Sequence, residues 1–580
     1  MKQSADLKRL LTSIDHKSYP AYKDVRGAYD FNTYILSIDH VQGDPFASPS
    51  KVSVQIRHTK AGFPAELFDT PWKKTALEDY LLRCFSREIG RLSFKAKGSG
   101  KSGLIATSRP GQEVLSRTAC EIGRNEITAR FEVGFPAFGR TINSGELIRI
   151  FFDFLPGCVE NVFFYRRQNN AEIKNRITLA DDQQFIRNEL KRLDLVSFVA
   201  DGSILPRETG VSDRPMKGSV AFHSPDSLRI TLNLPGHGPI SGMAIHRGIT
   251  LIVGGGYHGK STLLKALESG VYNHIPGDGR EYVITDETAV KLRAEDGRSI
   301  NHVDISLFIR DLPNKKDTTC FSTADASGST SQAAAVIESI EAGTRAFLID
   351  EDTSATNFML RDDLMQRIVS RDKEPITPFI ERARDLYKQA GISTVLVAGS
   401  SGAYFFIADT IIQMDAYRPF DITEMVKNAC EQEVSKPAIQ APGFKLPTAG
   451  RKLAADGTGR AVGAMALNFG DSRAEAGGES QEEGENSGRS GRFGNRGGSA
   501  SDAGRFERGR GGRREADRNS DRNTRIKVRV HDKHSFQVAK EPVDLRFVEQ
   551  LADSEQTAAL AQMVRYCLEK GLLERCTVQE

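Results

Sequence analysis

The stretch ITLIVGGGYHGKS, residues 249–261, decides the fold of this chain. Its first five residues are apolar or β-branched and predict a buried strand, and GGGYHGKS then has the spacing G-x-x-x-x-G-K-S. The next residues, TLLKALE, predict a helix. A phosphate-binding loop requires this order, because backbone N–H groups and the positive helix N-terminus must face the same anion. A glycine-rich turn without a ligand is the structural alternative.

The residues of this loop have separate expected roles. The glycines let backbone N–H groups close around the β-phosphate, Lys260 reaches toward the β- and γ-phosphate oxygens, and the hydroxyl of Ser261 is a ligand for Mg²⁺. The residues expected to hold the nucleotide are Gly254, Gly255, Gly256, Tyr257, His258, Gly259, Lys260, Ser261 and Thr262.

A second part of the expected site is the run FLIDE, residues 347–351. In phosphate-loop ATPases, an apolar strand that ends in two carboxylates holds the metal and activates water. Asp350 is expected to hold Mg²⁺ through water, and Glu351 to orient or deprotonate the attacking water. Acidic residues are common at the ends of buried strands. This run therefore indicates an ATPase site only together with the phosphate-binding loop on the same chain.

A third part lies between these two, in ASGSTSQ at residues 326–332. It leads into the predicted helix AAAVIESIEAG. Small hydroxyl-bearing residues and glycine at the start of a helix form an anion site. Ser327 and Gly328 are the candidates for this site.

Five segments of the chain together resemble one family of proteins: GGGYHGKSTLL, AEDGR, ASGSTSQA, LIDEDTSATNFM and EPITPF. They closely resemble the predicted ABC-class ATPases that are soluble and have no transmembrane domain. That family includes ATPases associated with mitochondrial RNA-binding complexes. The resemblance covers roughly residues 20–430, and at the C-terminal end EPVDLRFVEQLADSEQTAAL looks like the family's small final domain.

The resemblance implies ATP and Mg²⁺ as cofactors and a homodimer as the active form. It implies that Ser327 and Gly328 cap the γ-phosphate of an ATP molecule bound to the partner subunit. It also places residues 352–357, DTSATN, in the loop that communicates across such a dimer. The chain carries one phosphate-binding loop and one signature-like segment, so two copies are needed for two complete sites.

The sequence departs from general ABC proteins at two positions. No glutamine occurs between Ser261 and Gln332, and Asp304 or Ser306 is the candidate replacement for the missing residue. Ser400, Ser401 and Gly402 stand where a switch histidine is expected. We therefore expect slow ATP hydrolysis, with nucleotide binding less affected.

The composition limits the classes of function. The 580 residues carry a formal net charge of only +3, so any nucleic-acid surface must be local. The seven cysteines are scattered and include no C-x-x-C pair, which favours a reduced compartment and indicates neither a disulfide framework nor a zinc site. No stretch has the pattern of a signal peptide or a membrane span. We expect an intracellular, most simply cytoplasmic, protein without a membrane partner, and an organelle stays open.

The predicted fold class is α/β, with a phosphate-loop core of the ABC-ATPase type. Changes in composition predict an α+β N-terminal domain, the ATPase core, a disordered Gly/Arg-rich segment and a small C-terminal α+β domain, at residues 1–199, 200–440, 441–525 and 526–580. RGG-type repeats with interleaved phenylalanines in the disordered segment favour RNA binding, and a solubilising linker is the alternative. In the last domain, IKVRVHD predicts a strand and VEQLADSEQTAALAQMVRYCLEKGLL a pair of helices.

Two further features leave alternatives open. Phe222 in VAFHSP could stack on adenine, although a core residue is favoured. A group of arginines in the β-rich N-terminal part either lines a nucleic-acid channel or forms an ordinary solvated face. These arginines are Arg109, Arg117, Arg124, Arg130 and Arg140.

The sequence predicts a soluble homodimeric ABC-class ATPase that binds and hydrolyses ATP at its two-fold interface. Dimer closure is expected to drive the binding or remodelling of RNA or another single-stranded nucleic acid. The alternative is a nucleotide-gated protein-assembly factor with no direct nucleic-acid role. A transporter subunit is a third possibility, which the large N-terminal extension and the RGG segment fit poorly.

Overall fold

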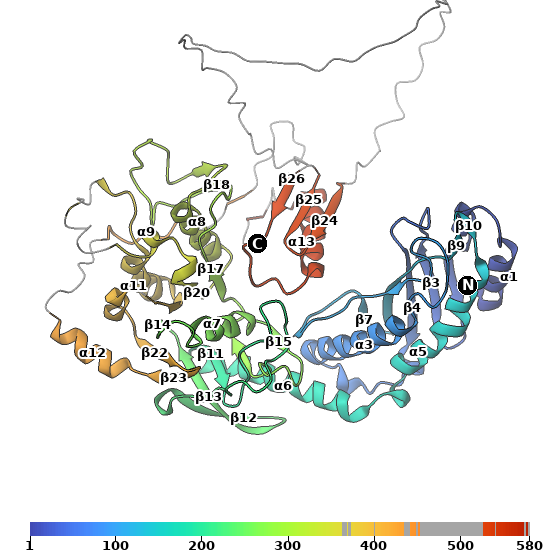
Figure 1. Ribbon diagram of the computed structural model, residues 1–580, viewed down its shortest axis with the longest axis horizontal. Helices are drawn as coiled ribbons and strands as arrows, with labels where there is room; N and C mark the ends of the chain where they lie inside the picture. Colours follow the sequence, from blue (N-terminus) through green and yellow to red (C-terminus); the bar gives the residue numbers. More distant parts are fainter. Residues whose placement is uncertain are drawn as a thin grey trace, which may run out of the picture.

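The computed structural model contains three folded parts, an N-terminal domain, a larger core and a small C-terminal domain that lies between them (Figure 1). The structure describes residues 1–361, 368, 373–399, 401–433, 441–447, 451–452, 526–539, 541–572 and 576–577. Most of the Gly/Arg-rich segment, including its RGG repeats, lies outside these residues. Among the described residues, no helix combines the length and the apolar character needed to cross a membrane.

The N-terminal domain is an α+β unit built on a mostly antiparallel sheet of order β1-β2-β3-β4-β8-β5, with β7 also paired to β8. Helix α3 (Pro71–Leu92) carries Leu77, Leu81, Phe85 and Ile89 at four-residue intervals, and all four are buried in the core of this domain. The strands are β1 (Lys2–Gln3), β2 (Gly27–Asp30), β3 (Ile35–His40), β4 (Ser50–Arg57), β5 (Ile105–Ala106), β7 (Cys120–Ile122), β8 (Glu126–Val133) and the hairpin β9 (Ala137–Phe138) and β10 (Thr141–Ile142). The other helices are α1 (Ser4–Ser13), α2 (His58–Ala61), α4 (Ser144–Ile148) and α5 (Leu155–Phe163).

The core is organised around a six-stranded sheet of order β17-β20-β21-β14-β22-β23, parallel except for β23. Its central strands are almost entirely buried, as expected when helices cover both faces of a parallel sheet. The strands are β14 (Ile249–Val253), β17 (Val290–Leu292), β20 (Ala346–Asp350), β21 (Ser393–Val397), β22 (Thr410–Asp415) and β23 (Arg418–Asp421). The surrounding elements are α7 (Lys260–Ser269), α8 (Gly328–Glu341), α9 (Thr356–Met359), α11 (Phe379–Ala390), α12 (Thr423–Gln432) and the hairpin β18 (Ile300–Val303) and β19 (Phe321–Thr323).

A second sheet of the core is antiparallel and has the order β12-β13-β11-β16. Its strands are β11 (Leu195–Ala200), β12 (Arg229–Leu234), β13 (Gly238–His246) and β16 (Val283–Thr285). Side chains of both sheets and of α7 share one apolar cluster. Strand β11 precedes the boundary expected at residue 200, yet it pairs with β13 and β16 inside the core.

Helix α6 (Asn170–Arg192) also packs on the core. Arg187 on this helix donates to the side chain of Asn273 and to the carbonyl oxygens of Val271 and Thr285. Burial lowers the pKa of the Arg187 guanidinium to about 10. This helix is therefore fixed to the core by polar contacts that local sequence patterns do not indicate.

The first residues of the segment predicted to be disordered contact the core. Phe444 and Leu446 pack against the apolar cluster under α8 and α11, and the guanidinium of Arg451 donates to the carboxylate of Glu341. Pro442 accepts a hydrogen bond from the buried Arg382 at 2.6 Å. The chain is thus held on the core at residues 441–447 and 451–452.

The C-terminal domain consists of an antiparallel sheet, β24 (Val528–Asp532), β25 (Ser535–Val538) and β26 (Glu541–Asp544), covered by α13 (Ser554–Glu569). Of the pair of helices predicted over residues 548–573, the described residues show α13 and turns before it, and residues 573–575 lie outside the described part. Asp553 caps α13 by accepting from the N–H groups of Glu555 and Gln556, so the residues before it form turns.

Polar contacts join the three parts. Strand β6 (Glu113–Val114) of the N-terminal side pairs with β15 (Asn273–His274) of the core. Tyr272 donates to the carbonyl oxygen of Gln550 at 2.7 Å, which ties the C-terminal domain to the core. Arg117 contacts the buried Asp79 of α3 and two acidic residues at the start of α13. The C-terminal domain therefore touches both larger parts.

Candidate nucleotide-binding site

The phosphate-binding loop connects β14 to α7, and two of its glycines stand where a side chain would not fit. Gly254 has a φ of 138°, and a Cβ there would lie 2.3 Å from the carbonyl oxygen of Met414. Gly259 has a φ of 96°, and a Cβ there would lie 2.7 Å from the ring of Tyr417. Both angles lie in the region that favours glycine. The shape of the loop and its close packing on the β22–β23 turn therefore require glycine at these positions.

The side chain of Lys260 is folded over the loop. Lys260 begins α7, and its ammonium group donates to the carbonyl oxygens of Gly254 at 2.8 Å and Gly255 at 2.9 Å. Ser261 and Thr262 follow in the first helical turn, with Ser261 exposed. An ammonium group, two hydroxyls and the N-terminus of a helix thus meet at one place, which suits the binding of phosphate.

His258 ties the same loop to the turn between β22 and β23. Its Nδ1 lies 2.8 Å from Oδ1 of Asp415 and 3.0 Å from the backbone nitrogen of Ala416, which donates to it. The N–H of Tyr417 donates to the carbonyl oxygen of His258 at 3.1 Å. Tyr257 differs from its neighbour, because its side chain is fully exposed. Within this loop, His258 has a positioning contact that Tyr257 lacks.

The register of the parallel sheet places Asp350 near the loop. Asp350 at the end of β20 pairs with Val397 of β21, and Val397 pairs with Ile252 of β14. Since neighbouring strands lie about 4.8 Å apart, the Cα of Asp350 lies about 10 Å from that of Ile252. The Asp350 carboxylate is largely buried and accepts from the N–H of Asp352 at 3.2 Å. The phosphate-binding loop and the acidic end of β20 therefore lie together at the carboxyl-terminal end of the parallel strands.

Glu351 contacts the segment that follows β21. Its Oε2 accepts from the N–H of Gly399 at 2.7 Å. Gly399 directly precedes the serines at the position of the expected switch histidine, of which Ser400 lies outside the described residues. Ser401 accepts from the N–H of Ala403 at 3.2 Å and so caps a short helical turn. The Glu351 carboxylate is held by the backbone at this point.

The signature-like segment forms the start of α8. Ser327 is exposed at the N-cap, and its hydroxyl lies 2.9 Å from that of Thr330. Gly328 is buried, and a Cβ there would lie 3.2 to 3.4 Å from atoms of Asp296, Ala294 and Ala355. The structure therefore packs this segment against the AEDGR loop and against residues 352–357, while Ser327 points to solvent.

Gln332 joins α8 to the segment that follows Glu351. Its side chain is fully buried, its Nε2 donates to the hydroxyl of Ser354 at 3.0 Å, and its Oε1 accepts from the N–H of Ala355 at 2.9 Å. The sequence motif contained this glutamine, but no local pattern indicated its partners. Gln332 is a positioning residue for the acidic end of the site.

Replacing Gln332 by Ala is expected to lower the free energy of unfolding by about 1–3 kcal/mol, because two partly buried polar groups lose their partner. Urea-induced unfolding measures this change. Gln389→Ala is the control, since Gln389 is exposed on α11 and bonds only to Asp385 in the described part of the chain. Equal losses in the two variants would contradict the assignment.

The residues present suit ATP and Mg²⁺. The hydroxyl of Ser261 and the carboxylate of Asp350 are hard oxygen donors, the kind that Mg²⁺ prefers. The contacts of Lys260 with two carbonyl oxygens hold a positive charge at the loop, where phosphate oxygens can replace those acceptors. The described part of the chain contains no group of three or more His, Cys, Asp or Glu side chains arranged for a metal ion.

The remaining sequence candidates have structural roles. Asp304 accepts from the N–H of Ser306 at 2.9 Å, so both residues belong to one local turn. Phe222 is buried in the apolar cluster between the two sheets, as the core interpretation predicts. Arg117 is buried at the domain junction, Arg130 pairs with Glu121, and Arg140 pairs with Asp44. Arg117 therefore belongs to neither an open channel nor a solvated face, whereas Arg109, Arg124, Arg130 and Arg140 are exposed.

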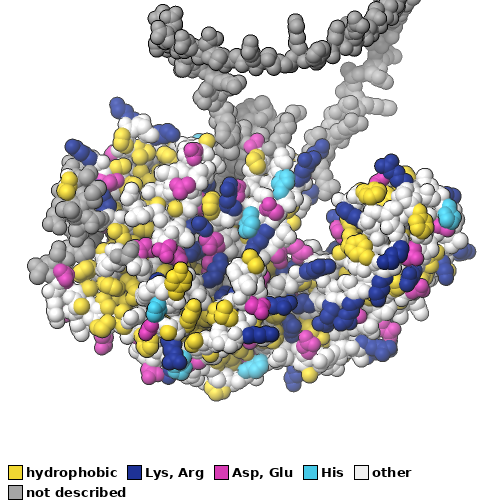
Figure 2. Space-filling model, viewed as in Figure 1, with side chains coloured by type: hydrophobic (Ala, Val, Ile, Leu, Met, Phe, Trp, Pro, Cys, Tyr) yellow, Lys and Arg dark blue, Asp and Glu magenta, His cyan; other side chains and the backbone are white. Residues whose placement is uncertain are grey.

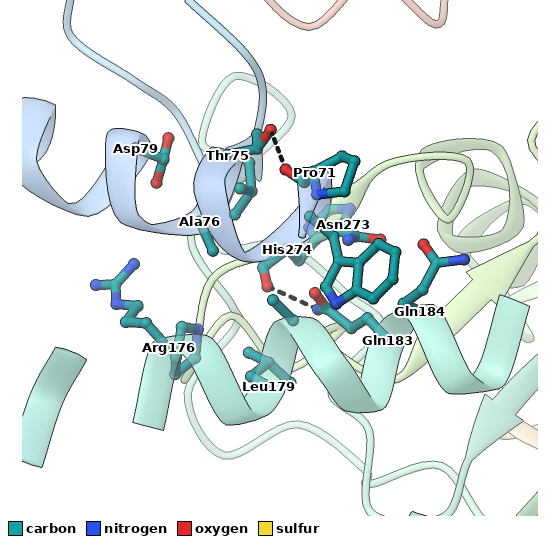
Figure 3. Close-up of a pocket in the computed structure, with 14 residues that line it drawn as sticks. Pro71, Thr75, Ala76, Asp79, Arg176, Leu179, Gln183, Gln184, Asn273 and His274 are labelled. Atoms are coloured by element: carbon teal, nitrogen blue, oxygen red, sulfur yellow. Dashed lines mark hydrogen bonds between the residues drawn. The ribbon is translucent and has the colours of Figure 1, made fainter. Parts of the chain in front are cut away.

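A separate hollow of about 280 Å³ lies between α3 and α6 (Figure 3). Gln183 on its α6 side donates to the carbonyl oxygen of His274 at 2.9 Å, and Thr75 on its α3 side donates to that of Pro71 at 3.0 Å. Residues of the phosphate-binding loop do not line it. This hollow belongs to the junction of the N-terminal domain and the core.

A phosphate-binding loop between a strand and a helix, together with an acidic residue at the carboxyl end of a strand in the same sheet, defines a P-loop nucleotide-binding protein. Residues 169–445 match the P-loop domain of ABC ATPases, and residues 4–166 match the N-terminal domain of ATPases of the ABC class. Residues 527–580 match the MRB1590 C-terminal domain. The chain belongs to the ATPases of the ABC class, and a P-loop domain of this class binds ATP.

One curated relative and two solved structures are also similar to this chain. The uncharacterized protein MJ1628 of Methanocaldococcus jannaschii is 31% identical over 239 residues, which are 40% of this chain and 51% of the relative. The chain thus spans about half the length of that relative. The structure of cbiO1 from Clostridium perfringens, part of the ABC transporter complex cbiONQ, is 14% identical with a TM-score of 0.26 and covers 41% of this chain and 92% of its own. The ADP conformation of MJ1267, an ATP-binding cassette of an ABC transporter, is 13% identical with a TM-score of 0.23 and covers 34% and 88%.

Proposed function

We propose that the protein is a homodimeric ATPase that binds and hydrolyses ATP at a two-fold interface and couples dimer closure to the binding or remodelling of RNA. The observation that carries this proposal is the position of Ser327. It is exposed at the start of α8, whereas the cavity beside Ser261 and Thr262 is lined by other segments. A second copy can therefore approach Ser327 from solvent, and two copies complete two equal sites.

In the closed dimer, the backbone of residues 254–259 and the Lys260 ammonium bind the phosphates. Mg²⁺, when bound, neutralises phosphate charge. The hydroxyl of Ser261 would be a ligand for this ion, and the carboxylate of Asp350 would hold it through water. Glu351 accepts the proton of the attacking water, and the N–H of Gly399 orients its carboxylate. Ser327 and Gly328 of the partner subunit cap the γ-phosphate, where the N-terminus of α8 stabilises negative charge.

The interface has a direct test in the Glu351→Gln variant, which is designed to retain ATP. Sedimentation velocity with ATP and Mg²⁺ is expected to show a dimer, and without nucleotide a monomer or weaker association. Adding Ser327→Arg should prevent the dimer, because a bulky cation would replace the exposed serine at the proposed contact. A Glu351→Gln protein that stays monomeric when saturated with ATP and Mg²⁺ would overturn the dimeric site.

The RNA part of the proposal is supported by three observations. The sequence resembles ATPases of mitochondrial RNA-binding complexes, and residues 527–580 match the MRB1590 C-terminal domain. Lys and Arg side chains are spread over the face where the N-terminal domain, the core and the C-terminal domain meet (Figure 2). The segment at 470–525 is rich in Arg and Gly. Flexible guanidinium groups bind phosphates and stack on unpaired bases.

A gel shift with short single-stranded RNA tests this part. The full-length chain is expected to bind at low salt, with an affinity that falls steeply as salt rises, because phosphate contacts release counterions. Deletion of residues 470–525 is expected to weaken binding. If neither protein binds at low salt, the RNA role fails, and the nucleotide-gated protein-assembly factor becomes the better account.

A further inference from the structure

The AEDGR loop at residues 294–298 belongs to the family resemblance but has no role in the proposed function. It follows β17, which lies at the edge of the six-stranded sheet beside β20. The outer side of an edge strand carries backbone groups that no further strand of the sheet pairs with. The segment from the edge strand to the end of the loop, residues 289–298, contacts both the C-terminal domain and the start of α8.

Backbone hydrogen bonds hold the AEDGR loop against the signature-like segment. The N–H of Gly297 donates to the carbonyl oxygen of Ala326 at 2.9 Å, and the N–H of Ala326 donates to the carbonyl oxygen of Arg298 at 3.0 Å. The N–H of Glu295 donates at 2.9 Å to the hydroxyl of Ser331, which is fully buried. The position of the loop therefore determines where the start of α8 lies.

The same loop also contacts the middle of α8 and the segment after Glu351. The guanidinium of Arg298 donates to the carboxylate of Glu338 at 2.7 Å. The N–H of Ala294 donates to the carbonyl oxygen of Thr353 at 3.0 Å. The loop is thus packed between the signature-like helix and the acidic end of the site.

The C-terminal domain holds the other end of the segment through Gln550. The Nε2 of Gln550 donates to the carbonyl oxygen of Ala289 at 3.0 Å, and its Oε1 accepts from the N–H of Lys291 at 3.0 Å. A neighbouring strand would supply the same two partners. The side-chain amide therefore covers the outer edge of β17 and fixes the C-terminal domain to it.

Arg293 brings this contact to the beginning of the loop. It donates to Glu549 at 2.7 Å, and its guanidinium lies 5.1 Å from the centre of the Phe547 ring. Both charged side chains are less than one-third exposed, so the pair is partly shielded from water. One peptide bond separates Arg293 from Ala294. The docked C-terminal domain therefore fixes the point at which the loop begins.

We propose that the C-terminal domain positions the signature-like segment for the ATP molecule bound to the partner subunit, with Arg293 and Gln550 as positioning residues. This inference rests on the proposed ATP-dependent dimer. Ser327 and Gly328 must meet the γ-phosphate in one arrangement, and a segment that is already held loses less conformational freedom when the subunits close. Docking of the C-terminal domain on β17 therefore strengthens the closed dimer.

Dimer formation by chains that carry Glu351→Gln tests this inference. Sedimentation velocity with ATP and Mg²⁺ is expected to show about 2- to 30-fold weaker association after Arg293→Ala or Gln550→Ala is added, the range in which residues between two coupled sites change their coupling. Arg293→Lys keeps a cation beside Glu549 and should recover part of the lost affinity.

Arg546→Ala is the matched control. Arg546 also lies against the Phe547 ring, but it is exposed and pairs with Asp544 of its own domain. Its removal leaves the contacts with β17 and with the AEDGR loop in place. The dimer of this variant should be as stable as that of the Glu351→Gln chain alone.

Two further measurements separate positioning from a general loss of structure. Equilibrium dialysis measures ATP affinity after Ser327→Arg is added to keep the chain monomeric, and Arg293→Ala should leave this affinity unchanged. Amide hydrogen exchange of the nucleotide-free chain should become faster in the Arg293→Ala variant at residues 294–298 and 326–332, because the loop loses its support.

Equal association of Arg293→Ala, Gln550→Ala and Arg546→Ala would overturn the inference and leave the dimer intact. Weaker association with unchanged exchange at residues 294–298, or with weaker ATP binding by the monomer, would also overturn it, because the contact would then act by another route. A Glu351→Gln chain that stays monomeric with ATP and Mg²⁺ would instead refute the proposed dimer.

Discussion

Glu351→Gln is expected to reduce ATP turnover at least about 100-fold, the lower end of the contribution of a general base. The amide has the shape of the carboxylate but cannot take a proton from water at neutral pH. Its carbonyl oxygen can still accept from the N–H of Gly399, so the side chain should keep its position. Phosphate release at saturating ATP measures turnover, and equilibrium dialysis measures ATP affinity, which should persist.

A surface carboxylate provides the control for this prediction. Glu287→Gln removes a charge at an exposed pair with Lys191, away from the loop, and turnover should stay at the wild-type level. Turnover that is unchanged in Glu351→Gln would exclude Glu351 as the base. Loss of ATP affinity together with turnover would show instead that the carboxylate supports binding. The missing switch histidine makes this residue the main candidate for activating water.

Arg117→Ala is expected to lower the free energy of unfolding by about 3 kcal/mol and to loosen the contact between the C-terminal domain and the N-terminal domain, while Tyr272 still holds Gln550 on the core. The guanidinium is 6% exposed and contacts Asp79 at 3.3 Å, Asp553 at 2.6 Å and Glu555 at 3.1 Å. Burial already raises the pKa of the Asp79 carboxyl, so removing one of its cations disfavours its charged form further. Arg83 still pairs with Asp79, which limits the loss.

Urea-induced unfolding measures the stability of this variant, and limited proteolysis measures the exposure of the C-terminal domain. Arg130→Ala is the matched control from the same domain, because Arg130 is exposed and its pair with Glu121 should contribute at most about 1 kcal/mol. Equal losses of stability in the two variants, with equal rates of proteolysis, would contradict a linking role for Arg117.

The parts of the site that were predictable from sequence are those with a local cause. The strand, loop and helix around Lys260 follow one another along the chain, and the apolar run before Asp350 marks its own strand. The start of α8 at Ser327 likewise follows from small residues before a helical segment. Each of these elements depends on residues only a few positions apart, so periodicity and spacing reveal it.

How these elements are placed relative to one another was visible only in the tertiary structure. The sequence assigned Tyr417 no role, although it lies against Gly259, which is 158 positions away (417 − 259 = 158). The sequence predicted that Arg117 either lies on a solvated face or lines a channel. In the structure, Arg117 is buried against Asp79 and the start of α13. The helical segment predicted from Val548 begins only at Ser554, because Asp553 caps α13 and the residues before it form turns.

By itself, the sequence determined that a phosphate-binding loop, an acidic strand end and a signature-like helix start exist, since each arises from neighbouring residues. Tertiary structure alone decided that Asp350 lies two strands from the loop and that the C-terminal domain covers the edge strand β17. Those facts depend on strand order and on contacts between distant segments, and local sequence patterns carry no information about which distant segments will meet.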